Sequence, residues 1–152
     1  MNVIEAPMEV DRADLFLAGG ITGARLWQQE AIAQLAHLDG TLFNPRRSHN
    51  FREEDADEQV EWEYRALRRS GAILFWFPPE TLCPITLYEL GVWGNQHTVP
   101  IFVGTDPGYL RRYDVVKQLS LAQPNITVHN RLEDVTGAFE AYRAPRESGG
   151  RV

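Results

Sequence analysis

The sequence predicts a doubly wound α/β domain built on a parallel sheet of five strands in the order 2-1-3-4-5. Residues 72–77, AILFWF, form an uninterrupted apolar run, which is typical of a strand buried on both faces of a parallel sheet. Other strand-length segments alternate along the chain with segments of helical length. Right-handed crossovers between parallel strands give this strand order most simply.

The first half of the chain is expected to supply two strands and two helices. Residues 14–18 form a hydrophobic strand that runs into a glycine-rich loop, and residues 24–37 form a helix with one apolar face. Asp39-Gly40 predicts a turn into a short strand over residues 41–43. A polar loop leads to a helix over about residues 55–70. Residues 2–5 offer a further short strand, although residues 1–12 as a whole show no clear pattern.

The second half starts with the apolar run, which Pro78-Pro79 ends. Pro84 suits the first turn of a helix that continues to Trp93. The remaining strands are expected at residues 99–104 and 126–128, and the remaining helices at residues 109–121 and 132–142. Residues 144–152, rich in Pro, Gly, Arg and Ser, predict a flexible tail behind one domain of residues 1–143.

Composition narrows the classes of partner. The 152 residues are 43% hydrophobic, which is enough for one packed core, and 15 basic against 21 acidic residues give a net charge of −6. Without a Lys/Arg cluster, polymeric nucleic acid and anionic membranes are not expected as partners. One cysteine, no signal peptide pattern and no apolar run of transmembrane length predict a cytoplasmic protein.

Three loops should meet where the predicted strands end, since ligands of open α/β sheets bind beyond the carboxyl ends of the strands. They span residues 19–23, 44–47 and 78–83. Gly19 and Gly20 would let backbone N–H groups approach a ligand, although a plain tight turn fits equally well. Asn44 and Arg46, or Arg47 in its place, could hold a hydroxyl, a phosphate or a base edge, or form a solvated basic turn.

Two glutamates are expected to point into this cleft from neighbouring helices. Glu89 has mostly apolar same-face neighbours three and four positions away, and Glu63 has a similarly apolar face. A Glu in an early helix turn can also be held there by the helix dipole alone. Paired acids in different surroundings suit glycosidic-bond chemistry. Trp62 is either a stacking platform for a planar ligand or a core residue.

Other chemistries have little support in the sequence. The four histidines are scattered and predict no metal site, and no G-x-S-x-G motif suggests a Ser/His/Asp hydrolase. Cys83 precedes a helix start, which can lower a thiol pKa, yet no histidine stands near it in sequence. A structural or loop-lining role therefore fits Cys83 better than a nucleophilic one.

Several segments together resemble the nucleoside 2-deoxyribosyltransferase family, and more closely its deoxyribosyltransferase-like branch. They are Phe16 to Thr22 with the glycine loop, Asn44-Pro45-Arg46, Trp62-Glu63, Phe77-Pro78 and Tyr88-Glu89-Leu90-Gly91. The match runs over roughly residues 14–104, and its most specific part is the Glu-Leu-Gly at Glu89.

The resemblance implies a flavodoxin-like or Rossmann-like three-layer sandwich and an enzyme that needs no cofactor. In that family the Glu of the Glu-Leu-Gly motif, here Glu89, attacks C1′ of a 2′-deoxynucleoside, and the resulting glycosyl ester passes the sugar with net retention to a second base or to water. The family's acid on the preceding helix, which binds and protonates the base, corresponds to Glu63. The substrate would touch Gly19, Gly20, Thr22, Asn44, Arg46, Trp62, Phe77, Pro78 and Cys83. The family also forms homo-oligomers in which a neighbour's C-terminal region completes the site.

The same resemblance leaves the reaction open between transfer and hydrolysis. The transferases carry a further base-binding acid about six residues before the nucleophile, and that place falls at or near Cys83 here, with Glu80 in the same loop. A nucleoside 5′-monophosphate hydrolase, with Arg46 or Arg47 on the phosphate, is therefore an alternative. A non-catalytic nucleotide-sensing module is a second alternative.

Overall fold

The computed structural model describes residues 1–9, 11–48 and 52–144. The polar loop expected before the second helix lies partly, and the expected C-terminal tail almost wholly, outside these residues. The elements follow one another as β1 Asn2–Glu5, β2 Leu15–Gly19, α1 Trp27–Leu35, β3 Thr41–Asn44, the short 3-10 helix η1 Glu53–Asp55, α2 Ala56–Arg68, β4 Ile73–Phe77, α3 Pro84–Trp93, β5 Ile101–Thr105, α4 Arg112–Ala122, β6 Val128–His129 and α5 Leu132–Arg143.

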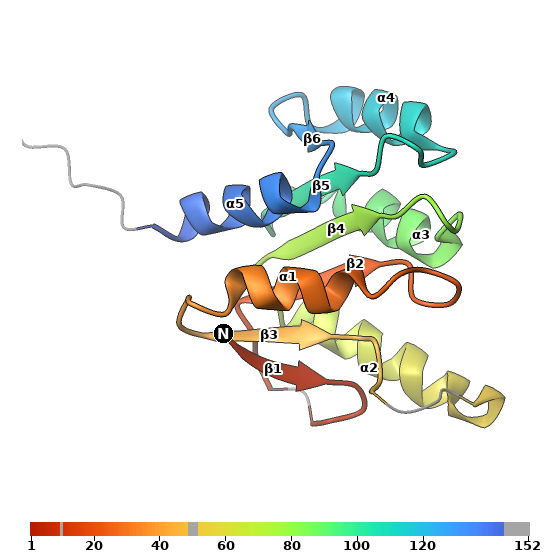
Figure 1. Ribbon diagram of the computed structural model, residues 1–152, viewed down its shortest axis with the longest axis vertical. Coiled ribbons are helices and arrows are strands. Elements are labelled where there is room, and N and C mark those ends of the chain that lie inside the picture. Colours follow the sequence, from red (N-terminus) through yellow and green to blue (C-terminus); the bar gives the residue numbers. More distant parts are fainter. Residues whose placement is uncertain (10, 49–51, 145–152) are drawn as a thin grey trace, which may run out of the picture.

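The strands form one parallel sheet in the order β1-β3-β2-β4-β5-β6 (Figure 1). Without β1 this is the predicted order 2-1-3-4-5, and the α/β prediction is confirmed. The short strand offered at residues 2–5 also forms, because it pairs in parallel with β3 and adds a sixth strand at the edge.

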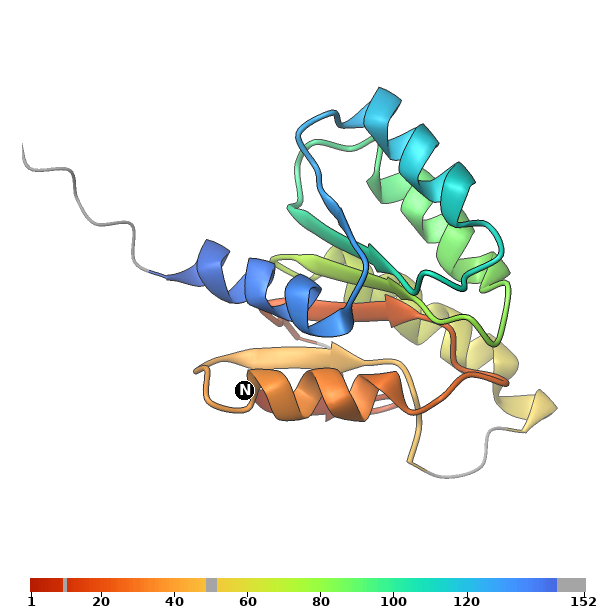
Figure 2. The ribbon, with the colours of Figure 1, turned by 45° about the horizontal axis from the view of Figure 1, so that its top comes forward.

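Helices cover both faces of the sheet: α1 and α5 lie on one face, and α2, α3 and α4 on the other (Figure 2). Successive strand residues point to opposite faces, so Leu15 and Leu17 of β2 pack towards Trp27 of α1, whereas Phe16 packs towards Trp62 of α2. All five residues of β4 are buried, as the apolar run predicted.

Two helices begin later than the sequence pattern suggests. The first starts at Trp27 rather than near residue 24, because the backbone carbonyls of the preceding loop accept hydrogen bonds from the Arg46 side chain. The fourth starts at Arg112, since residues 106–109 form a turn in which the Tyr109 N–H donates to the Asp106 carbonyl over 2.9 Å. No helix in the described part of the chain is long and apolar enough to cross a membrane.

Candidate active site

Three central strands end side by side and bring the expected loops together. β3, β2 and β4 are neighbours in the sheet and end at Asn44, Gly19 and Phe77. The loops that follow lead into α2, α1 and α3, at the right-hand edge of the sheet in Figure 1. This edge is where open parallel sheets place their ligands.

Glu89 lies in the second turn of α3 on the helix's buried face. Pro84 suits the first turn of the helix, and the buried residues of the helix are Thr86, Glu89, Leu90 and Trp93. Glu89 is only 8% exposed, and among the described residues none donates a hydrogen bond to its carboxyl group. Burial, with a smaller contribution from the negative charge of Glu63, raises the pKa of Glu89 to about 8.

Glu63 lies on α2, and its negative charge acts on Glu89. Burial raises the pKa of Glu63 as well, but a hydrogen bond from Gln59 and the positive charge of Arg47 oppose that rise. The Gln59 Nε2 atom lies 2.7 Å from Glu63 Oε1. The two carboxyl groups thus have different surroundings: Glu63 has partners that favour its charged form, whereas Glu89 has a desolvating environment and a like charge.

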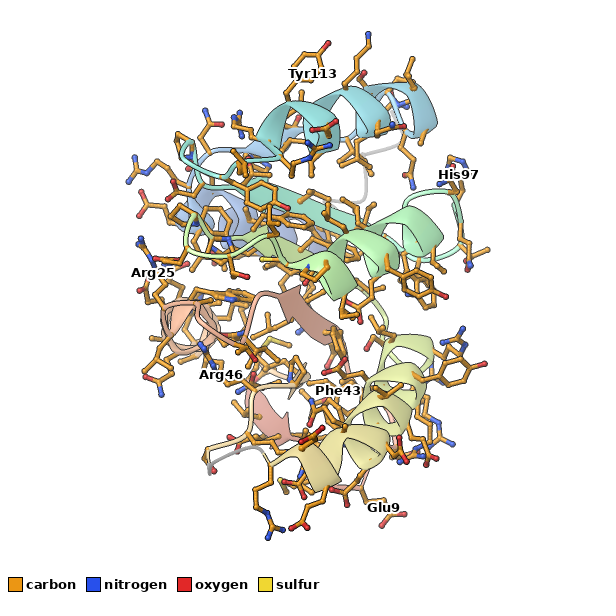
Figure 3. All side chains as sticks on the ribbon, turned by 90° about the vertical axis from the view of Figure 1, so that its right-hand side faces the viewer. Glu9, Arg25, Phe43, Arg46, His97 and Tyr113 are labelled. Atoms are coloured by element: carbon orange, nitrogen blue, oxygen red, sulfur yellow. The ribbon has the colours of Figure 1, made fainter. Side chains whose placement is uncertain are left out.

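Arg46 organises the glycine loop. Its guanidinium Nη1 donates to the carbonyl of Arg25 (2.7 Å) and to Gln28 Oε1 (2.9 Å), and its Nη2 donates to the carbonyls of Ala24 (2.9 Å) and Ile21. Figure 3, which views this edge of the sheet, labels Arg46 and the Arg25 of that loop. Burial lowers the pKa of Arg46. In this structure the guanidinium therefore holds protein groups rather than presenting itself to a phosphate.

The first and third loops are in direct contact through Gly20 and Cys83. A Cβ atom on Gly20 would lie 2.7 Å from Cys83 Sγ, so only glycine fits there. Cys83 has a left-handed backbone (φ 49°) and is 4% exposed, and burial raises the pKa of its thiol to about 11. The thiol is therefore neutral at physiological pH, which agrees with a loop-lining role.

The other predicted substrate-binding residues fall into two groups. Thr22 is exposed on the glycine loop, and Asn44 is buried, with its Oδ1 accepting from the Arg46 N–H (3.1 Å). Trp62 and Phe77 are core residues: Trp62 is 1% exposed, packs on Phe43 and donates from Nε1 to the Met8 carbonyl (2.6 Å).

The burial of Trp62 and Phe77 leaves no ring face for a ligand to stack on. Pro78, which follows β4, lies near Gly20, since a Cβ atom on Gly20 would be 3.3 Å from Pro78 Cγ.

Two features of the site were not expected from the sequence. Gln59 and Arg47 form a buried hydrogen-bonded connection to Glu63, although the spacing of Gln59 and Glu63, four residues apart on a helix, already placed them on one face. Tyr109, 3% exposed, donates from its hydroxyl group to the Leu82 carbonyl (2.8 Å) and so supports the third loop from the turn after β5.

The glutamate pair suits covalent acid–base chemistry rather than metal chemistry. Within the described ranges, no three His, Cys, Asp or Glu side chains converge as a metal site would require. Two hollows lie elsewhere: one at the amino ends of the strands, beside Asp14 and Arg143, and one between α3 and α4. A carboxylate that attacks carbon and a second carboxyl group that handles a proton are the elements of retaining glycoside chemistry.

Comparison with known protein families identifies the family of the chain. A family model described as "nucleoside 2-deoxyribosyltransferase like" matches residues 12–108, which is more than half of the chain. The matched stretch contains the three loops and both glutamates. A search of curated proteins found no match.

Proposed function

Because the chain belongs to the nucleoside 2-deoxyribosyltransferase-like family, we propose that it cleaves the N-glycosidic bond of a nucleoside or 2′-deoxynucleoside and passes the sugar to another base. The nucleophile of this proposal is Glu89, and Glu63 is the acid–base partner. The observation that carries it is the pair itself, in which the charge of Glu63 on α2 adds to burial in raising the pKa of Glu89 on α3.

The pair holds the proton that the first step consumes. With its pKa raised to about 8, Glu89 carries a proton at neutral pH in the free protein. When substrate binds, this proton passes to Glu63 and leaves Glu89 as a carboxylate. A Glu89 oxygen then bonds to C1′, the N-glycosidic bond breaks, its electron pair goes to the base nitrogen, and Glu63 protonates the departing base.

The second step reverses these roles. A nitrogen of the incoming base attacks C1′, the ester bond breaks, and Glu89 recovers its electron pair. Glu63 takes the proton that the incoming base releases. Two displacements at C1′ give net retention, and no group beyond the side chains and the two bases takes part.

Hydrolysis, in which water replaces the second base, is the alternative that one specific observation favours. Cys83 is neutral and buried at the place where the resemblance implies a base-binding acid. Glu80, the nearest acid in that loop, instead pairs with Arg25 over 2.7 Å. Arg46 and Arg47 already donate to protein groups, so a version of hydrolysis that requires a 5′-phosphate on these arginines has less support.

The proposed homo-oligomer has one supporting feature next to Glu89. On the outer side of α3, Ile85 and Tyr88 are 63% and 72% exposed, so the helix that carries the nucleophile presents apolar surface outwards. Light scattering during size-exclusion chromatography would test this: a monomer at micromolar concentration would rule it out.

Trapping of the ester would test the function. The protein is incubated briefly with nucleosides and nucleoside monophosphates that carry 2-fluoro-2-deoxy sugars, which slow the breakdown of a glycosyl ester, and its intact mass is measured. We expect a sugar-sized adduct that peptide mapping places on Glu89, and none in Glu89→Gln. Glu61→Gln, on the exposed side of α2, is the matched control and should still form the adduct.

The other outcomes of this experiment separate the remaining functions. With the natural substrate, an added free base that captures the sugar indicates transfer, and release of free sugar regardless of added base indicates hydrolysis. Absence of any adduct, together with ligand-dependent thermal stabilisation, would contradict the enzyme and support the nucleotide-sensing module.

A further inference from the structure

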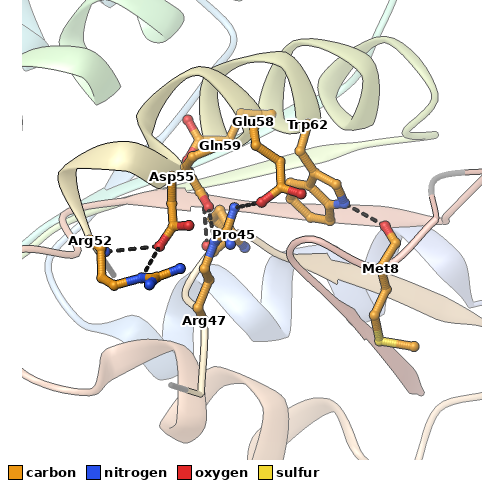
Figure 4. Close-up of polar contacts among 9 residues, drawn as sticks. Met8, Pro45, Arg47, Arg52, Asp55, Glu58, Gln59 and Trp62 are labelled. Carbon is orange, nitrogen blue, oxygen red and sulfur yellow. Dashed lines mark hydrogen bonds and ion pairs between the residues drawn. The ribbon is translucent and has the colours of Figure 1, made fainter. Parts of the chain in front are cut away.

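A buried arginine connects the loop after β3 to the proposed acid–base residue. The side chain of Arg47 is 4% exposed. Its Nε donates to Gln59 Oε1 over 2.7 Å, and its Nη2 donates to Glu58 Oε2 over 2.9 Å (Figure 4). The guanidinium thereby binds two successive residues in the first turns of α2.

Arg47 fixes the orientation of the Gln59 amide. A carboxamide has one acceptor oxygen and an NH2 group with two donors. The oxygen faces Arg47, and Nε2 donates both to the Pro45 carbonyl (2.8 Å) and to Glu63 Oε1 (2.7 Å). A rotated amide would set donors against the guanidinium and its oxygen against the Pro45 carbonyl and the Glu63 carboxyl, so only one orientation satisfies all three contacts.

This orientation distinguishes the two oxygens of Glu63. Oε1 accepts a hydrogen bond from an amide that can only donate there, which disfavours a proton on Oε1. We propose that Gln59, held by Arg47, is a positioning residue that keeps Oε1 of Glu63 as an acceptor and leaves Oε2 as the oxygen that exchanges the catalytic proton. This inference rests on the proposed function of Glu63.

The charges around Glu63 set the expected pH effect. The charge of Arg47 in the loop after β3 and the neutral amide of Gln59 on its own helix act on Glu63, and Glu63 in turn acts on Glu89 of α3. The hydrogen bond from Gln59 and the charge of Arg47 lower the pKa of Glu63, whereas burial raises it. Loss of the Gln59 donor should therefore raise the pKa of Glu63.

Gln59→Leu and Gln59→Glu separate the two contacts of this amide. Leucine removes both the acceptor for Arg47 and the donor to Glu63. Glutamate keeps the acceptor for Arg47 but adds a charge and no longer donates to Glu63. The matched control is Gln123→Leu, because Gln123 makes a similar hydrogen bond, from Nε2 to the Gly94 carbonyl (2.9 Å), at the end of α4.

The first readout is the pH dependence of kcat/KM for base release, which reports the free protein. Activity requires one proton on the glutamate pair, so kcat/KM should fall on the acid side when both carboxyl groups are protonated and on the alkaline side when neither is. We expect both Gln59 variants to lose about tenfold or more in kcat/KM, as is common when a supporting hydrogen bond to a reacting group is lost. We also expect their acid limb to move to higher pH, further in Gln59→Glu, with the alkaline limb little changed.

The second readout needs no turnover. Carboxyl carbon resonances of 13C-labelled glutamate, assigned with Glu63→Gln and Glu89→Gln, report the titration of Glu63 in the free protein. The Glu63 titration should move to higher pH in both Gln59 variants and stay in place in Gln123→Leu. If Gln59→Leu does not fold, Gln59→Glu gives the same comparison with the Arg47 contact kept.

The outcomes distinguish this inference from the proposed function. A lower kcat/KM with an unmoved acid limb and an unmoved Glu63 titration would overturn the positioning role, because a merely structural residue would behave in that way. A wild-type protein that turns over no nucleoside would overturn the proposed function. In that case the carboxyl titration alone would still support or overturn the control of Glu63 by Gln59.

Discussion

Buried or half-buried carboxyl groups at the two ends of the same sheet lie in opposite kinds of environment. At the amino ends, Asp14 accepts a hydrogen bond from the Thr41 N–H (2.8 Å) and lies 3.7 Å from Arg143 Nη2. Near the carboxyl ends, Glu89 is more deeply buried, no described residue donates to it, and the negative charge of Glu63 acts on it.

The difference separates a structural acid from a candidate catalytic one. A compensated carboxylate such as Asp14 stabilises the fold by a modest amount. An uncompensated one such as Glu89 destabilises the fold whenever it is charged, and groups with that property are concentrated at functional sites. Variants at both ends of the sheet can test this contrast.

The largest effect is expected from Glu89→Gln on turnover. Glutamine cannot form the glycosyl ester, so kcat should fall by about 10⁴-fold or more, as is typical when an enzyme loses its nucleophile. Steady-state base release measures it, with Glu61→Gln as the control. Activity within tenfold of wild type in a Glu89→Gln preparation checked by mass would exclude the ester mechanism.

Glu63→Gln should have a smaller and substrate-dependent effect. Loss of the proton donor should lower kcat by about 10²- to 10⁴-fold for natural nucleosides. The loss should be much smaller for a 2-deoxyriboside with a 4-nitrophenolate leaving group, which departs without protonation. An equal loss for both substrates would count against proton transfer by Glu63.

The stability of the protein should also reveal the uncompensated charge of Glu89. Burial raises its folded-state pKa from 4.5 to about 8, so between these values the folded protein holds a proton that the unfolded chain has lost. The free energy of unfolding should therefore decrease as the pH rises through this range.

Glu89→Gln removes that pH dependence. At pH 5 it should match wild type, and at pH 9 it should exceed it by on the order of 3 kcal/mol. Urea unfolding at the two pH values measures the difference. Equal stability of the two proteins at pH 9 would show that Glu89 is not destabilised by burial.

The smallest effect is expected at the other end of the sheet. Asp14→Ala removes the acceptor for the Thr41 N–H and the ion pair with Arg143, and should destabilise the fold by about 1 kcal/mol without changing kcat. Urea unfolding and base release test both parts. A large loss of turnover would remove the contrast between the two ends of the sheet.

The fold was largely predictable because short stretches of the sequence specify most of its strands and helices. The buried strands are continuous apolar runs, and β4 is the clearest example. The weakest expectation concerned β1, a four-residue edge strand with exposed and half-buried positions that pairs with β3 in the described sheet. Its formation depends on an edge about 40 residues further along the chain, and no short window of sequence contains that edge.

The site was less predictable because residue type does not specify the partner. Arg46 suits a phosphate as well as a carbonyl, and its partners at Ile21 and Ala24 lie more than 20 residues away. The indole of Trp62 donates to Met8, at a separation of 54 residues, and this contact shows which of its two expected roles it fills. Gln59 and Glu63, by contrast, are linked by helical spacing alone.

The contact between Gly20 and Cys83 has a practical consequence. Cys83 carries the only thiol of the chain, and this thiol is buried where the first and third loops contact each other. Its pKa of about 11 keeps it protonated. An alkylating reagent can react with it at an appreciable rate only while those loops are apart. The rate at which Cys83 is alkylated in the native protein therefore reports how often the first and third loops separate.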